Sequence, residues 1–329
     1  MNRSVEAVTV RQIRVASDQA GRRIDNFLAG LLKGVPRSRI YRMLRTGEVR
    51  VNGGRVQADH RLKVDDLVRI PPVRQRLASA PPAKRLGFLL EDNLLYEDEA
   101  IVVLNKPPGL PVHGGSGFSF GVIEMLRALR PNEPYLELAH RLDRDTSGCL
   151  MLVKQARLLR QVHDMFRQGT VTKHYLTLVQ GRWQGPARII DEGLRSKVLH
   201  SGERRVEVRP EGKQARTSIA PIELFACASL MEVKLLTGRM HQIRVHAAHI
   251  GHPVAGDEKY GDNAFNVKMR GYGLRRLFLH AKSLRFKRPD SGDRISVEAG
   301  LPDDLLGVLE NLRAEKSAHS TGAFVKLGP

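Results

Sequence analysis

Residues 140–148 read His-Arg-Leu-Asp-Arg-Asp-Thr-Ser-Gly and run directly into the apolar stretch Cys-Leu-Met-Leu-Val at 149–153. The second stretch is typical of a buried strand, and the first sets two arginines and two aspartates at the mouth of that strand. A carboxylate in this position is partly desolvated and needs a cationic partner to stay ionised, and such enforced pairs are over-represented in active sites. Arg141, Arg144 and the distant Arg244 are the available partners. The stretch therefore predicts both a central strand and a site of chemistry.

Strands and helices alternate irregularly on both sides of this stretch, over residues 89–313. The sequence carries neither a fixed repeat period nor a dinucleotide-binding fingerprint, so the pattern does not favour a doubly wound sheet. We predict an α+β domain around a mixed sheet. The expected strands are 100–104, 149–153, 172–179 and 230–236, and the expected helices are 122–129, 158–166 and 241–250.

A smaller compact unit is predicted at residues 21–70. Its first helix has apolar residues at helical spacing, a second helix follows between Pro36 and Gly47, and Asn52-Gly53 marks a tight turn before a closing strand. The second helix carries four arginines with no acidic residue between them: Arg37, Arg39, Arg42 and Arg45. A charge run is usually a solvated helix face, but this clustering favours contact with RNA. The whole unit resembles the small S-four-type RNA-binding domain, named after a ribosomal small-subunit protein.

Three further segments complete the predicted organisation. Residues 71–88 contain four prolines and four Arg or Lys with almost no periodicity, which is the composition of a linker. Residues 1–20 form an N-terminal extension, and the polar residues 314–329 form a flexible tail.

Length and charge bound the class of protein. The 329 residues are enough for about two domains, and 54 Lys and Arg against 35 Asp and Glu give a net charge of +19. This surplus favours RNA or DNA as a partner over a membrane, because no apolar run approaches the roughly 18 residues of a spanning helix. The N-terminus lacks the apolar core of a secretory signal, so we expect a cytoplasmic protein. Cys149 and Cys227 suggest neither a disulfide framework nor a zinc site.

The stretch at 140–148, together with four other segments, resembles the RluA family of RNA pseudouridine synthases. These segments are NKPPG at 105–109, KHY at 173–175, TGRMHQIRVH at 237–246 and GDEKYG at 256–261. The resemblance implies a catalytic domain around a mixed, largely antiparallel sheet that isomerises specific uridines of large-subunit ribosomal RNA to pseudouridine. It also implies that the enzyme uses no cofactor and no metal, and we expect a monomer.

The resemblance also implies roles for single residues. Asp143 matches the catalytic carboxylate, which must lie close to the anomeric carbon where positive charge develops as the glycosidic bond opens. Arg244 matches its cationic partner, and Tyr175 the aromatic residue that packs on the flipped uracil. Arg141 matches the arginine that fills the gap left in the RNA, because a guanidinium can stack where a base was. Whether Asp143 attacks ribose, attacks the base or removes a ribose proton stays open.

The residues themselves allow plainer interpretations of several positions. Asp145, beside Thr-Ser-Gly, is typical of a turn. Tyr175 fits an ordinary strand residue from its spacing alone. Lys106 stands before two prolines and a glycine, so it also fits a rigid turn with no part in the site.

Three other functions fit parts of the sequence. Residues 117–121, GFSFG, fit the nucleophile elbow of serine hydrolases, but a glycine-rich loop precedes Ser119 where that elbow needs a buried strand. A metal site would use the histidine cluster at 241–252, yet no carboxylate or cysteine completes the set before Asp257. A non-catalytic RNA-binding or ribosome-assembly factor fits the charge but gains nothing from Asp143, since a carboxylate facing phosphate weakens binding.

Overall fold

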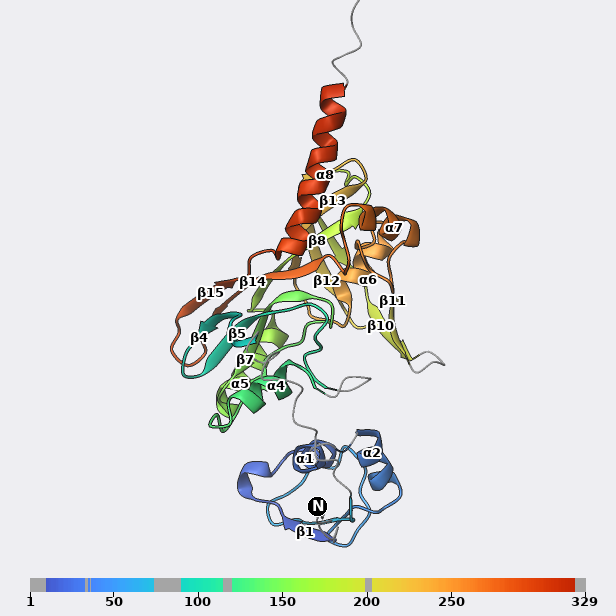
Figure 1. Ribbon diagram of the computed structural model, residues 1–329. Helices are drawn as coiled ribbons and strands as arrows, with labels where there is room; N and C mark the ends of the chain where they lie inside the picture. The colour runs from blue at the N-terminus through green and yellow to red at the C-terminus, as the bar shows by residue number, and fades with distance from the viewer. Residues whose placement is uncertain are drawn as a thin grey trace, which may run out of the picture. The chain divides into compact units, whose positions relative to one another are not determined.

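The structure is a computed structural model that describes residues 10–32, 35, 37–73, 90–114, 120–198 and 203–322. The chain divides into two compact units, Met1–Pro82 and Ala83–Pro329, here called the N-terminal unit and the C-terminal unit (Figure 1). The expected helix start at Pro36, most of the predicted linker 71–88 and Ser119 of the elbow pattern lie outside the described residues. In the part of the chain that is described, no helix has both the length and the apolarity to cross a lipid bilayer.

The N-terminal unit packs two helices against a three-stranded antiparallel sheet. The helices are α1 (Ile24–Leu31) and α2 (Arg37–Arg45), preceded by the short helix η1 (Ser17–Gln19), and the strands are β1 (Arg11–Arg14), β2 (Arg50–Val51) and β3 (Leu67–Ile70) in the order β1-β3-β2. Its core is made by apolar side chains of both helices and of β3, among them Leu28, Met43 and Val68. These are the apolar stripes that the spacing predicted.

Strand β1 corrects the predicted boundary at residue 21. It lies within the supposed extension 1–20, yet it pairs with β3 from Arg11 opposite Ile70 to Arg14 opposite Leu67. Its sequence, Arg-Gln-Ile-Arg, contains one apolar residue, because an edge strand with both faces largely exposed needs no apolar alternation. The sequence pattern therefore gave no indication of it.

The C-terminal unit is built on one ten-stranded sheet in which β7 and β14 are central. Its main path runs β4-β5-β7-β14-β8-β13-β12-β9, while β6 pairs with β7 and β15 pairs with β14. All pairings in this sheet are antiparallel except that of β7 with β14, which is parallel, so the prediction of a mixed, largely antiparallel sheet is confirmed. The strands are β4 (Leu94–Glu97), β5 (Ile101–Lys106), β6 (Glu137–Leu138), β7 (Ser147–Val153), β8 (Thr172–Gln180), β9 (Arg188–Asp191), β12 (Arg216–Leu224), β13 (Ala228–Leu235), β14 (Leu279–Lys287) and β15 (Arg294–Glu298).

Helices cover both faces of this sheet. Every residue of β7 is buried, and its side chains alternate between two core clusters: Leu150 and Leu152 pack with α4, whereas Met151 and Val153 pack with α5. Strand β7 therefore reads as one apolar run because both of its faces are covered. The helices are α4 (Val122–Leu129), α5 (Ala156–Gln168), α6 (Gln242–His249), α7 (Asn263–Gly271) and α8 (Asp303–Gly322).

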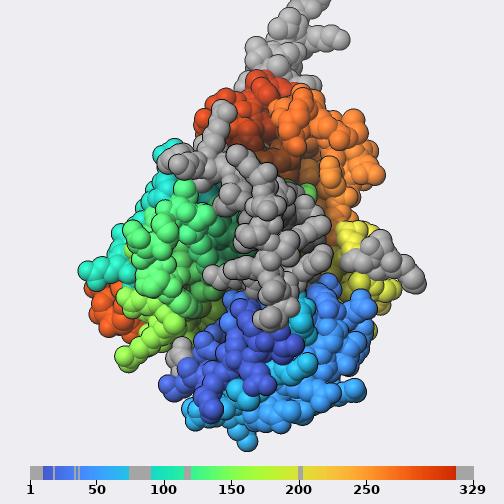
Figure 2. Space-filling view, turned by 60° about the horizontal axis from the view of Figure 1, so that its bottom comes forward, coloured from blue at the N-terminus to red at the C-terminus, as the bar shows by residue number. Residues whose placement is uncertain are grey.

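Two features stand apart from the layered sheet. The hairpin of β10 (Leu194–Val198) and β11 (Arg204–Val208) projects from one side (Figure 1), and its yellow surface adjoins the orange segment that contains α7 (Figure 2). Helix α8 continues to Gly322, so the predicted start of a flexible tail at residue 314 falls inside a helix. The apolar spacing ends at Leu312, and the helix continues there through Ala314 and Glu315, which favour helix, with Glu315 accepting a hydrogen bond from the Tyr272 hydroxyl at 2.6 Å.

Gly148 lets β7 begin close against β14. Its φ is +106°, and a Cβ atom on this residue would lie 2.2 Å from the carbonyl oxygen of Ala281. Only glycine combines that backbone conformation with so close an approach. The parallel contact of His280 and Ala281 with Ser147 and Gly148 therefore holds the start of β7, and the turn before it, against the middle of the sheet.

Candidate active site

A cleft of about 1160 Å³ opens where the turn before β7 meets the start of α6 and the loop that precedes α7. This volume slightly exceeds the roughly 300–1,000 Å³ typical of small-molecule sites. Eight of its lining residues are Arg or Lys and five are Asp or Glu, so the cleft favours an anionic ligand. The eight cationic residues are Arg141, Arg144, Arg205, Arg244, Lys259, Arg270, Arg275 and Arg276.

Asp143 lies at this cleft, in the turn that precedes β7. The turn is closed by a hydrogen bond from the Thr146 N–H to the Asp143 carbonyl at 3.2 Å. The side chain is 25% exposed, and its Oδ2 accepts a hydrogen bond from Arg244 Nη1 at 3.1 Å. Asp143 and Arg244, which lie 101 positions apart in the sequence, are thus in contact. The Asp143 carboxylate remains partly accessible to a ligand.

Arg244 is held in turn by a second aspartate. Its Nε donates to Asp257 Oδ2 at 2.7 Å and its Nη2 donates to Asp257 Oδ1 at 2.8 Å, while the Asp257 side chain is fully buried. Asp257 also accepts the backbone N–H groups of Lys259 and Tyr260 at 2.9 and 3.0 Å. This network keeps the guanidinium in one orientation, with Nη1 directed to Asp143.

Pairing also keeps Asp257 and Arg244 charged despite their burial. Burial alone raises the pKa of Asp257, but the Arg244 guanidinium outweighs it and the net pKa lies below the usual value. Burial alone lowers the pKa of Arg244, and its carboxylate partners Asp257 and Asp143 raise it above the ordinary value overall. The cation beside Asp143 is therefore permanent.

His241 is a residue of the site that the sequence analysis did not single out as functional. It caps the start of α6 with a left-handed backbone at φ 54°, ψ 20°, which is uncommon for a residue other than glycine. Its Nδ1 lies 2.8 Å from the hydroxyl of Tyr260, and its Nε2 lies 3.8 Å from Asp143 Oδ2. The segment 237–246 is part of the family resemblance, but nothing in its sequence distinguishes His241 from the other histidines as a residue of the site.

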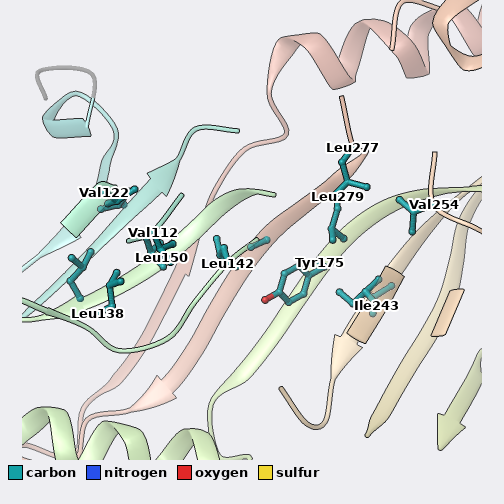
Figure 3. Packing of buried hydrophobic residues seen from close by; sticks show 14 of the residues in the cluster. Val112, Val122, Leu138, Leu142, Leu150, Tyr175, Ile243, Val254, Leu277 and Leu279 are labelled. Carbon is teal, nitrogen blue, oxygen red and sulfur yellow. The ribbon is translucent and has the colours of Figure 1, made fainter. Parts of the chain in front are cut away.

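Tyr175 lies beneath the site rather than at its surface. It is buried in the main core cluster, where Figure 3 shows its ring between Leu142 and Ile243, with its hydroxyl directed away from Ile243. Burial raises the pKa of Tyr175, and the nearby Asp143 carboxylate raises it further. The phenol therefore keeps its proton at neutral pH. Its neighbour Leu142 lines the cleft, so Tyr175 is one layer below the ligand space.

The other predicted residues of the turn have clear positions. Arg141 is exposed at the cleft, where its guanidinium can reach a ligand. Arg144 and Asp145 pair with each other through two hydrogen bonds of 2.9 Å, and both lie in the turn. The carboxylate of Asp145 is thus engaged by its neighbour, which agrees with its interpretation as a turn residue.

Lys106 has a larger structural part than its sequence context indicated. The side chain is completely buried, and its Nζ donates to the carbonyl oxygens of Pro107, Leu110 and Arg144 at 2.8, 2.9 and 2.9 Å. Burial lowers the pKa of Lys106 to about 7, whereas the carboxylates of Asp145 and Asp143 act to raise it. Three carbonyl acceptors match the three N–H donors of an ammonium group, so Lys106 ties the 107–110 loop to the turn that carries Asp143.

The arginines of α2 are not equivalent within the N-terminal unit. Arg39 donates two hydrogen bonds to Glu48 at 2.8 and 3.1 Å, whereas Arg42 and Arg45 are exposed. The side chain of Arg37 lies outside the described residues. Among the described side chains of this helix, Arg42 and Arg45 are therefore the exposed cations, whereas Arg39 is engaged by Glu48.

Two more of the clustered histidines, besides His241, have partners inside the protein. His246 lies 2.9 Å from the Thr217 hydroxyl and 3.1 Å from the Glu192 carbonyl, and His252 lies 2.7 Å from the Gln180 carbonyl. These contacts link α6 and the loop after it to neighbouring strands. They account for His246 and His252 as structural residues.

Both units match known protein families. Residues 100–249 match the RNA pseudouridylate synthase family, and residues 22–68 match the S4 domain. The first match contains Asp143, Tyr175 and Arg244, and the second contains α1, α2, β2 and the first two residues of β3.

Similar proteins extend over nearly the whole chain. Ribosomal large subunit pseudouridine synthase C of Pasteurella multocida (strain Pm70) is 48% identical over 313 residues, which cover 94% of this chain and 96% of that protein. The protein of the same name from Escherichia coli (strain K12) is 48% identical over 314 residues, which cover 94% of this chain and 98% of its own length. Among solved structures, Human RNA Pseudouridylate Synthase Domain Containing 4 is 26% identical with a TM-score of 0.58, over 70% of this chain and 96% of that one.

Proposed function

This chain belongs to the RNA pseudouridylate synthase family, and from that premise we propose that it converts specific uridines of large-subunit ribosomal RNA to pseudouridine, with Asp143 as the catalytic carboxylate. The reaction breaks the bond between the uracil and its ribose, turns the base, and rejoins it through a ring carbon. Positive charge develops at the anomeric carbon as the bond opens, so a carboxylate is needed beside it.

One observation carries the proposed role of Asp143. Its carboxylate is partly exposed at a basic cleft, and Arg244, whose side chain is largely buried, donates to one of its two oxygens. The cation pairs with one carboxylate oxygen, the cleft attracts a polyanion, and the other oxygen can approach a ribose. Asp257 has the same charge but is sealed by Arg244 and the backbone, so it acts as a support.

We propose that the target uridine enters the cleft after leaving its stack in the RNA. Extrusion of a base costs a few kcal/mol, which a side chain that takes its place can offset. Arg141 is exposed at the cleft and presents a planar guanidinium that suits both stacking and phosphate contact. Tyr175 supports the ligand space from below, and we propose that it relays the final ring proton: its oxygen takes up that proton as its own O–H proton passes to the nearby Asp143 carboxylate.

The substrate follows from the relatives and from charge. The similar proteins at 48% identity are named for the ribosomal large subunit, and they align with more than nine-tenths of this chain, including its N-terminal unit. The net charge of +19 and the exposed arginines of α2 suit a long RNA. Because ribosomal RNA lies in the cytoplasm of bacteria, we propose that the reaction takes place there.

A non-catalytic RNA-binding factor is the second candidate, and Asp143 separates the two. The enzyme requires this carboxylate for chemistry, whereas a binder would bind RNA as well or better without it, because the repulsion of phosphates is removed. Membership of a synthase family favours the enzyme.

Unmodified large-subunit ribosomal RNA incubated with the protein tests the proposal, with pseudouridine mapped by carbodiimide-dependent stops of reverse transcriptase. New stops are expected with the wild-type protein and none with Asp143→Asn, while RNA binding is retained. Asp145→Asn is the matched control, because it removes a neighbouring carboxylate that is already paired with Arg144, and it should leave the stops in place. Identical stops from the wild type and Asp143→Asn would refute the role of Asp143.

A further inference from the structure

His241 and Tyr260 connect the β10–β11 hairpin with the Asp143 carboxylate. The Tyr260 hydroxyl oxygen accepts the backbone N–H of Val206 on β11 at 2.9 Å and lies 2.8 Å from His241 Nδ1. The opposite ring nitrogen of His241, Nε2, faces Asp143 Oδ2 at 3.8 Å. These contacts form a chain that runs from the hairpin backbone through the Tyr260 phenol and the His241 imidazole to the Asp143 carboxylate.

This order of contacts determines the tautomer of the imidazole. Since the Tyr260 oxygen already accepts a hydrogen bond from the Val206 N–H, its own O–H is the group available to donate to His241 Nδ1. Nδ1 is then an acceptor, and the proton of the neutral ring lies on Nε2. The reverse tautomer would direct an Nε2 lone pair at the Asp143 carboxylate, which is repulsive.

The ring is also neutral in this environment. Burial lowers the pKa of His241, and although the carboxylates of Asp143 and Asp257 raise it, the cations of Arg244 and Lys259 lower it further. These four groups face the ring from three segments of the chain. A neutral ring with one N–H, rather than an imidazolium with two, is therefore what Asp143 meets.

We propose that His241 is a positioning residue that presents an Nε2–H to Asp143 Oδ2, and that Tyr260 and the Val206 N–H of the hairpin hold it in this tautomer. The inference rests on the proposed role of Asp143 in uridine isomerisation. The present 3.8 Å is too long for a hydrogen bond, so the atoms must approach by about 1 Å as substrate binds. Arg244 and His241 would then both donate to Oδ2, which leaves Oδ1 to face the ribose.

The backbone of His241 supports a specific placement of its ring. A left-handed conformation in a residue other than glycine costs on the order of 1 kcal/mol and persists where the surroundings determine it. Here the ring is engaged by Tyr260 on one side, with an edge contact between rings whose centroids are 5.5 Å apart. Asparagine tolerates this conformation best among the other residues, which provides a variant that keeps the backbone.

Two substitutions distinguish the effect of the His241 Nε2–H from the effects of the backbone conformation and of the Tyr260 hydrogen bond. In His241→Asn the side-chain oxygen can still accept the Tyr260 proton, but no N–H reaches Asp143. In His241→Gln the amide nitrogen takes the place of Nε2 and still reaches Asp143. We expect single-turnover pseudouridine formation to fall about tenfold in His241→Asn and to recover in part in His241→Gln, with an unchanged dissociation constant for RNA. His249→Asn, at an exposed position of the same helix, should not differ from the wild type.

Nitrogen NMR of protein labelled at its histidines tests the tautomer without any measurement of activity. The spectrum of His241→Asn identifies the His241 signals by difference, and they should report a neutral ring protonated at Nε2 near pH 7. Tyr260→Phe should convert this single form into a mixture of tautomers. A wild-type ring protonated at Nδ1, or a rate in His241→Asn equal to that of the wild type, would overturn the inference. Activity in Asp143→Asn would instead overturn the proposed function, so the two failures are distinguishable.

Discussion

Arg244 and Asp257 form a two-pronged ion pair, with hydrogen bonds of 2.7 Å from Nε and 2.8 Å from Nη2, at a point where the carboxylate is fully buried. The remaining Nη1 reaches Asp143. The same guanidinium thus ties a support residue in the interior to an accessible carboxylate at the cleft. The position of Asp143 therefore depends on a second aspartate whose own side chain is closed off by Arg244 and the backbone.

Arg244→Ala should destabilise the C-terminal unit by about 3–5 kcal/mol, because it leaves the Asp257 charge buried without its partner. Arg244→Lys should cost less but still abolish most activity, since an ammonium cannot hold both aspartates in one plane. Urea unfolding followed by the fluorescence of Trp183, the single tryptophan of the chain, measures the free energy of unfolding. Arg285→Ala is the control, because the Arg285–Glu298 pair is more than half exposed and its loss should cost at most about 1 kcal/mol. Equal effects of the two alanine variants would contradict this prediction.

Tyr175→Phe should separate packing from proton transfer. Phenylalanine keeps the ring in its place between Leu142 and Ile243, so the free energy of unfolding should change by less than about 1 kcal/mol. Because the proposed removal of the final ring proton needs the hydroxyl, the single-turnover rate should fall about 10²-fold while RNA binding is unchanged. Tyr175→Ala should in addition lose about 3–5 kcal/mol of stability. A rate in Tyr175→Phe equal to that of the wild type would limit Tyr175 to packing.

The sequence predicted the class of fold because its strongest signals are local. The all-apolar run of β7 reflects a strand covered on both faces, and its flanking charges identified the turn that carries Asp143. The α+β class and the mixed, largely antiparallel sheet are confirmed. In contrast, β1 has one apolar residue and is recognisable only from its pairing with β3, which the sequence pattern does not contain.

The support of the site could not be predicted for a related reason. Asp257 is one acidic residue in a polar segment, and its burial arises only when α6 brings Arg244 to it. The orientation of His241 depends on a backbone angle and on contacts with Tyr260, neither of which has a pattern in sequence. The role of Lys106 could not be predicted either. Its local sequence indicates only a rigid turn, whereas one of its three carbonyl acceptors belongs to Arg144, 38 positions away.

The exposed arginines of α2 should govern the salt dependence of RNA binding. Arg42→Gln combined with Arg45→Gln should weaken binding and reduce the slope of log K against log salt by about 1 for each phosphate contact that is lost. Arg39→Gln should change the slope less, because its guanidinium is already engaged by Glu48. Binding titrations at several salt concentrations measure the slope. An unchanged slope in the double variant would place the RNA on another surface.

His140 should make the C-terminal unit sensitive to acid. Its Nε2 accepts the N–H of Met151 at 3.1 Å, and its ring packs on Phe166 with centroids 5.0 Å apart. Burial, assisted by the charge of Lys173, lowers the pKa of His140 from 6.5 to about 3. Between these two pH values the unfolded chain binds a proton at His140 that the folded protein excludes. The contribution of the neutral His140 to the free energy of unfolding is therefore fully present above pH 6.5 and is lost as the pH falls towards 3.

This single histidine should contribute up to about 1.4 kcal/mol of stability loss for each pH unit within that window. His140→Gln can still accept the Met151 N–H through its side-chain oxygen but cannot take up a proton, so its free energy of unfolding should fall less steeply with acid. Other buried histidines, His246 and His280, also have pKa values lowered mainly by burial, so part of the slope should remain. Urea unfolding at steps from pH 7.5 to 4 measures the difference in slope between the two proteins. His163→Gln, at an exposed position of α5, should keep the wild-type slope, and a slope in His140→Gln as steep as in the wild type would exclude His140 as the group that senses acid.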